Sequence, residues 1–206
     1  TVTLNDKTAP TLSSVGIASN NSTTTLAKVA DVVTLTFTAS ETIATPVVTF
    51  QSGGAAITDT SITYASSGNV WTAAYTANAS DTTGSVTYSI AFSDSAGNAG
   101  TAVTSGSGSV TFDKTAPTLS SVSIASNNST STLAAVGDNV TLTFTASETI
   151  STPVVTFVSG GAAITDTSVT YVNTSGNTWT AVYTTESNDT TGSVTYSIAF
   201  SDSAGN

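Results

Sequence analysis

The chain has 206 residues, of which 8% are charged, and thirteen acidic residues against three lysines give a formal net charge of −10. Because Arg is absent, the clustered cations of a nucleic-acid or anionic-membrane surface are missing, and neither partner is expected. Because His and Cys are absent, the usual ligands of zinc, haem and iron–sulfur sites and the Ser-His and Cys-His nucleophile pairs are also missing, so we expect no enzyme. The sequence contains no run of about eighteen apolar residues, so we expect no membrane insertion of this segment.

The first half of the chain reads as a series of short β-strands separated by polar turns. In residues 33–39, Val and other apolar residues alternate with threonines, which is the period-two pattern of a strand with one buried face. Shorter pieces around Ile57, Ile62 and Tyr64 continue the series. This even spacing predicts an antiparallel β-sandwich of about seven strands. The clearest expected strands are residues 12–17, 33–39, 47–50, 71–75, 86–92, 102–104 and 110–112.

The second half of the chain repeats the first. Asp-Lys-Thr-Ala-Pro begins at Asp6 and again at Asp113, and TGSVTYSIAFSDSAGN occupies residues 83–98 and, letter for letter, residues 191–206. Repetition over about a hundred residues predicts two domains of one fold, each large enough for its own core. We expect residues 6–112 to form the first repeat and residues 113–206 the second.

The ends of the chain do not coincide with the ends of these repeats. The sequence just before Asp6 matches residues 109–112, so residues 1–5 are expected to be the last strand of a preceding repeat. The second repeat stops before its own counterpart of that strand. Either a longer array is divided out of register, or one subunit donates its spare strand to the open edge of another. The donated residues would be Thr1, Val2, Thr3 and Leu4.

Three motifs carry a resemblance to a known family: Asp-Lys-Thr-Ala-Pro, Leu-Thr-Phe-Thr-Ala-Ser-Glu at 35–41 and 142–148, and Ser-Asp-Ser-Ala-Gly-Asn after Tyr-x-Ile-x-Phe. The whole chain resembles the tandem bacterial immunoglobulin-like (Big-type) repeats of large extracellular adhesins and surface filaments. The resemblance implies an all-β fold of two tandem immunoglobulin-like antiparallel β-sandwiches, the second lacking its last strand. It also implies export to the cell surface, neighbouring identical repeats or subunits as partners, and calcium as a possible stiffening ion between domains.

The acidic residues recur at equivalent places in the two repeats. In an immunoglobulin-like sandwich the N-terminal linker and two turns gather at one end, so these carboxylates are expected in two groups. No cofactor is required, but calcium takes six to eight oxygen ligands, and three carboxylates with loop carbonyls would suit it. Alternatively, the aspartates cap their own turns and the glutamates are solvated. The candidate calcium ligands are Asp6, Glu41 and Asp94 in one group, and Asp113, Glu148 and Asp202 in the other.

The function expected from these features is a structural repeat of an extracellular fibre or adhesin stalk. A filament subunit assembled by strand donation from residues 1–5 is the alternative. A carbohydrate-binding module would need an aromatic platform, for which Trp71 and Trp179 with Tyr75 and Tyr183 are the candidates, although they equally suit a core. Glycans are possible at the Asn-x-Ser/Thr sequences. These begin at Asn20, Asn21, Asn78, Asn127, Asn128, Asn139, Asn173 and Asn188.

Overall fold

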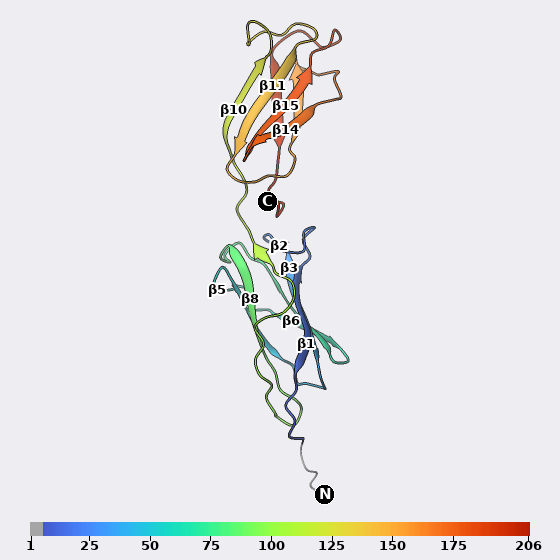
Figure 1. The fold of residues 1–206 in the computed structure, drawn as a ribbon, viewed down its shortest axis with the longest axis vertical. Coiled ribbons are helices and arrows are strands. Elements are labelled where there is room, and N and C mark those ends of the chain that lie inside the picture. The colour runs from blue at the N-terminus through green and yellow to red at the C-terminus, as the bar shows by residue number, and fades with distance from the viewer. Residues whose placement is uncertain (1–5) are drawn as a thin grey trace. The chain divides into compact units, whose positions relative to one another are not determined.

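The computed structural model describes residues 6–206, which form two compact units divided between Lys114 and Thr115 (Figure 1). The strand-donation candidates Thr1–Leu4 lie outside the described residues. Across residues 6–206 the regular elements are all β-strands. Within that range, accordingly, there is no helix with the length and apolar character needed to cross a membrane.

Unit 1 consists of two β-sheets that face each other across a core (Figure 1). The strands are antiparallel except for one short parallel pair, β2 with β9. The first sheet has the order β1 (Leu12–Ser19), β3 (Val32–Ala39), β7 (Val70–Thr76) and β6 (Thr63–Ser67). The second has the order β2 (Leu26–Ala27), β9 (Thr111–Phe112), β8 (Gly84–Ala91), β4 (Val47–Ser52) and β5 (Ala55–Ala56).

Unit 2 repeats this architecture without counterparts of β2 and β9 among the described residues. Its first sheet has the order β10 (Leu119–Ser126), β11 (Asn139–Ala146), β15 (Thr178–Thr184) and β14 (Thr170–Ser175). Its second has the order β13 (Ala162–Ala163), β12 (Val154–Ser159) and β16 (Val194–Ala199). The strand β16, which corresponds to β8, therefore ends its sheet.

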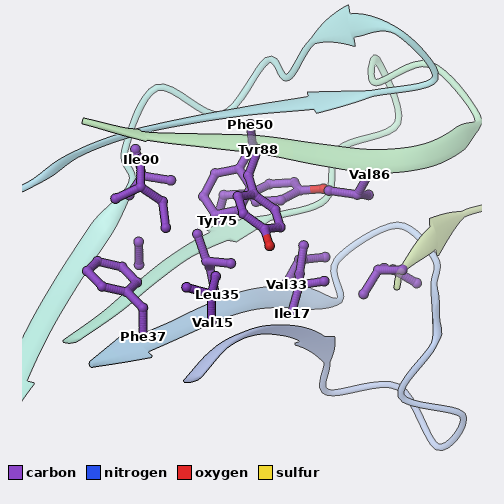
Figure 2. Packing of buried hydrophobic residues seen from close by; sticks show 14 of the residues in the cluster. Val15, Ile17, Val33, Leu35, Phe37, Phe50, Tyr75, Val86, Tyr88 and Ile90 are labelled. Carbon is purple, nitrogen blue, oxygen red and sulfur yellow. The ribbon is translucent and has the colours of Figure 1, made fainter. Parts of the chain in front are cut away.

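The alternating sequence of β3 explains both its strand conformation and its place in the core. Val33, Leu35 and Phe37 are fully buried, whereas the threonines between them face outward, where β-branched side chains suit a pleated surface. Across the core the ring of Phe50 from β4 lies 4.8 Å from that of Tyr75 on β7, centroid to centroid (Figure 2). Unit 2 repeats this pair with Phe157 and Tyr183 at 4.7 Å. The predicted period-two strands thus form the two inner faces of each unit.

We call residues 99–112 the closing segment of unit 1, because they join the exposed edges of its two sheets. On one side, the Ser107 amide donates to the carbonyl of Val15 at 2.8 Å. On the other side, the Val86 amide of β8 donates to the carbonyl of Val110 at 2.8 Å. The sequence predicts strands at 102–104 and 110–112. In the structure only Thr111–Phe112 forms a strand, β9, whereas Val103 forms a single β-bridge with Ile90. The segment changes partners along its length, which prevents one continuous ladder.

Candidate functional site

Three acidic side chains of unit 1 come together at one end of the sandwich, and we call them the acidic cluster: Asp6, Glu41 and Asp94. Glu41 follows β3 and Asp94 follows β8, and an antiparallel bridge between Ile43 and Asp94 brings the two turns together. The Asn98 side-chain amide donates to the Asp6 carbonyl at 2.9 Å and holds the N-terminal segment beside them. Carboxylate oxygens of the three acids lie within 4.8 Å of one another.

Asp94 organises the Ser-Asp-Ser-Ala-Gly-Asn turn in which it lies. Its Oδ1 accepts the amides of Ala96 at 2.9 Å and Asn98 at 2.8 Å, and its Oδ2 accepts the Asn98 side-chain amide at 2.6 Å. These hydrogen bonds, led by that of the Asn98 side chain, hold the pKa of Asp94 below its usual value. The carboxylate is therefore an ionised turn cap, and this role leaves lone pairs for a further electrostatic partner.

The donor chemistry of the acidic cluster suits a hard cation. Its three carboxylates surround a shallow pocket of about 370 Å³, to which Thr42, Ser95 and Ala96 also contribute. Carboxylates this close repel one another, and a divalent cation relieves that repulsion. All the ligand atoms are oxygens, which Ca²⁺ prefers and Zn²⁺ structural sites rarely use alone. Ion binding by this cluster remains a prediction.

Unit 2 contains two of the three residues of the second group. The Asp202 carboxylate accepts the backbone amide and the side-chain amide of Asn206, both at 2.9 Å, which reproduces the turn of unit 1. Carboxylate oxygens of Glu148 and Asp202 lie within 4.8 Å of each other. Asp113 belongs to unit 1, where its amide donates to the carbonyl of Ala27 at 2.8 Å. A calcium site made of Asp113, Glu148 and Asp202 would take its ligands from both units, and it stays a prediction.

The candidate aromatic platform is not assembled. Tyr75 and Tyr183 are only 2% and 1% exposed, and burial raises the pKa of both hydroxyls. Trp71 and Trp179 are half-buried and pack against the cores of their units. The tyrosines therefore cannot present their rings to a sugar, and the alternative role in core packing accounts for all four residues.

Two of the candidate glycosylation asparagines use their side-chain nitrogens within the fold. The Asn21 amide donates to Asp31 at 2.7 Å, and the corresponding Asn128 donates to Asp138 at 2.8 Å. A glycan attached to either nitrogen would disturb that hydrogen bond. Both asparagines therefore serve to close a loop, which the short Asn-x-Ser/Thr pattern does not distinguish from a modification site.

A buried carboxylate in unit 1 has a structural role that the sequence pattern did not indicate. Asp81 is 1% exposed and accepts the Thr58 amide and hydroxyl at 2.7 and 2.8 Å and the Asn78 amide at 2.9 Å. The Lys114 ammonium donates to the backbone carbonyls of Ala79 at 2.9 Å and Asp81 at 2.7 Å. We call this contact the linker anchor. The recurrence of Lys in Asp-Lys-Thr-Ala-Pro is the sequence signal that could have suggested it.

Two facing, mainly antiparallel sheets in each unit define the class of protein: a tandem pair of immunoglobulin-like β-sandwiches, as the sequence predicts. Among solved structures, the chain is similar to the I-band fragment I67–I69 from titin (12% identity, TM-score 0.45), covering 95% of this chain and 65% of that one. It is also similar to the titin tandem A164–A165 (13% identity, TM-score 0.30, 93% and 94% covered) and to the tandem Ig repeats of Dlar (13% identity, TM-score 0.29, 96% and 92% covered).

At these identities the similarity concerns the fold alone. The chain spans just under two thirds of the titin I67–I69 fragment. Neither the protein-family models nor the curated proteins compared with the sequence match it.

Proposed function

We propose that this chain is a structural repeat of an extracellular surface fibre or adhesin stalk, in which it provides reach and stiffness. The observation that carries the proposal is the tandem of two units with one fold and nearly one sequence. A surface with few cations and many Ser and Thr residues stays soluble and binds few partners nonspecifically. Such a surface suits a spacer rather than a binding tip.

The anchoring of the linker to unit 1 supports a stiff spacer. Asp113 and Lys114 are held to unit 1 by the backbone bond to Ala27 and by the linker anchor. In unit 2 the Thr118 amide donates to the Ser147 hydroxyl at 3.0 Å. Only Thr115, Ala116 and Pro117 lie between, and proline restricts the backbone there. Because the linker is this short and restrained, we expect it to bend little, as a stiff stalk requires.

The route of tension through unit 1 also suits a stalk. The closing segment leads out of the unit. It runs parallel to β1, the first strand of the unit, at the Gly16–Ser107 bridge, and its strand β9 runs parallel to β2. Pulling on the two ends of the unit would load these parallel hydrogen bonds together in shear. Bonds loaded together resist extension better than bonds broken one after another.

The experiment that tests the stalk proposal is the mass and location of the native polypeptide. We expect antibodies against unit 1 to label intact source cells, and to detect a denatured polypeptide many times larger than the 20.4 kDa of this chain. A native polypeptide near 20.4 kDa, or labelling only after lysis, would contradict a covalent extracellular array.

We further propose that the acidic cluster binds Ca²⁺ and thereby stabilises unit 1. The support is the proximity of its three carboxylates and their all-oxygen chemistry. At a Ca²⁺ concentration of about 100 times the Kd, unit 1 should gain about 2.7 kcal/mol, so its melting temperature should be higher than in a chelator.

The calcium test uses Glu41→Gln, which removes one ligand charge, and Glu186→Gln, which changes an exposed acid outside the cluster. Thermal unfolding in Ca²⁺ and in chelator is compared for each variant. Glu41→Gln should reduce the calcium-dependent shift of unit 1, whereas Glu186→Gln should retain it. Identical melting temperatures in Ca²⁺ and chelator for the unmodified chain would remove the proposal.

A further inference from the structure

The β-strands of both units carry no charge. None of the strands described within residues 6–206 contains Asp, Glu, Lys or Pro, so the charged residues of that range lie in loops, turns and the linker. Charged side chains and prolines on an exposed edge strand are two of the usual means by which a protein prevents that edge from pairing with another chain. Each sheet edge of this protein must therefore be protected in another way or remain open to pairing.

Three of the four sheet edges in unit 1 are protected in another way. The edge strands β2 and β5 have only two residues each. The edge strand β1 has a register shift between Ser13 and Gly16, and the closing segment is bonded to it. The fourth edge strand, β6, has neither feature, because its five residues pair one to one with β7 without a register shift. In the described part of the chain no other strand pairs with β6, so it is an open and regular edge.

The equivalent edge of unit 2 is interrupted by a bulge. Residues 171–179 are one residue longer than the equivalent residues 64–71, and the pairing of β14 with β15 shifts its register between Asn173 and Ser175. A bulge leaves a residue unpaired and increases the local twist, which hinders the addition of a further strand. The two units therefore present the same edge in an open and in a protected form.

The backbone of β6 is held in place with hydrogen-bonding groups directed outward. Ser67 and Val70 flank a two-residue turn, so they form a hydrogen-bonded pair. Because such pairs alternate along an antiparallel ladder, the amides and carbonyls of Tyr64 and Ser66 point away from β7. The Tyr64 hydroxyl accepts the amide of Val48 on β4 at 3.0 Å, which fixes β6 against the second sheet. The edge is thus ordered before any partner arrives.

We propose that β6 of unit 1 pairs antiparallel with β6 of a second copy of this chain, about a two-fold axis at Ala65. This register places Ala65 opposite its own copy, Tyr64 opposite Ser66 and Thr63 opposite Ser67. Tyr64 and Ser66, whose backbone groups point outward, exchange hydrogen bonds across the axis. The pairs bring no charged side chains together, and Thr opposite Ser is a favourable cross-strand pair. The pairing joins the two four-stranded sheets into one continuous sheet.

The self-pairing of β6 goes beyond the stalk function and does not require it. Antiparallel strands join chains that run in opposite directions, as two stalks extending from facing surfaces would, and this consequence alone rests on the proposed function. Self-association of the chain in solution is independent of where the native polypeptide lies or how long it is. Failure of either proposal would therefore leave the other standing.

The test is sedimentation equilibrium of the chain at about 0.15 M salt, which screens the repulsion between two chains of net charge −10. A single short strand pair is a small interface, so we expect a Kd of about 0.1–1 mM. The average mass should rise with concentration from 20.4 kDa toward twice that value. Ala65→Lys should weaken the association at least about tenfold, because the axis brings the two introduced lysines together. The matched control is Val172→Lys, at the equivalent exposed position of the bulged β14, which should leave the association unchanged.

Charge complementation tests the two-fold register and shows that the variants are folded. Chains with Ala65→Lys and chains with Ala65→Glu should each stay monomeric alone, because like charges meet at the axis. An equimolar mixture of the two should form heterodimers, because opposite charges then face each other. Residue 65 is exposed on an outer face of the sheet, so both substitutions should preserve unit 1.

Three results would overturn the proposal. The first is a mass that stays at 20.4 kDa up to a chain concentration of about 1 mM. The second is equal association of the Ala65→Lys chain and the unmodified chain, which would assign self-association to another surface. The third is a mixture of the Ala65→Lys and Ala65→Glu chains that remains monomeric, which would exclude pairing about Ala65.

Discussion

Replacing Phe112 by Ala is expected to lower the free energy of unfolding of unit 1 by about 3–5 kcal/mol and to leave that of unit 2 unchanged. Phe112 is 0% exposed and belongs to the core of unit 1. Removing its ring loses burial of a large apolar surface and leaves a cavity between the sheets. Unit 2 has no counterpart of this residue in the described chain, so it serves as an internal reference.

Urea unfolding can follow the two units separately, because the chain has one tryptophan in each. Trp71→Phe leaves fluorescence only in unit 2, and Trp179→Phe leaves it only in unit 1. The control is Val70→Ala, because Val70 is 42% exposed and its truncation should cost little. A Phe112→Ala effect below about 1 kcal/mol, or an equal loss in both units, would show that the closing segment is not part of the core of unit 1.

Most of the fold was predictable because its main strands carry a strict two-residue period. The alternation of Val33, Leu35 and Phe37 with threonines is strong enough to determine both the strand and its buried face. The closing segment was less predictable. Its conformation depends on tertiary contacts of Ser107 and two nearby glycines with β1, and such contacts leave no period in the sequence.

The candidate site was predictable to a similar, partial extent. The topology of a sandwich places the turns after β3 and β8 at one end, so the proximity of Glu41 and Asp94 follows from the order of the strands. The burial of Asp81 does not follow from that order. It depends on loop amides and on the linker anchor, and an isolated Asp in a polar turn gives no sign of either.

Replacing Asp81 by Ala is expected to destabilise unit 1 by about 3 kcal/mol, and the matched Asp189→Ala to destabilise unit 2 by roughly 1 kcal/mol. Both carboxylates accept the same set of bonds: the amide and hydroxyl of a threonine, at Thr58 or Thr165, and one loop amide. Asp81 is 1% exposed, so its donors would be left buried without a partner. Asp189 is half-buried, so water can replace it.

The measurement is urea unfolding of the same single-tryptophan chains, with Asp81→Asn and Asp189→Asn as variants that preserve size. Burial tends to raise the pKa of Asp189, but hydrogen bonds from Glu186 and Thr165 outweigh it and leave the pKa below 3.8. The stabilisation of unit 2 by Asp189 is therefore full above pH 3.8 and is lost as the pH falls below it. Equal losses for Asp81→Ala and Asp189→Ala at neutral pH would mean that burial adds nothing to the shared hydrogen bonds.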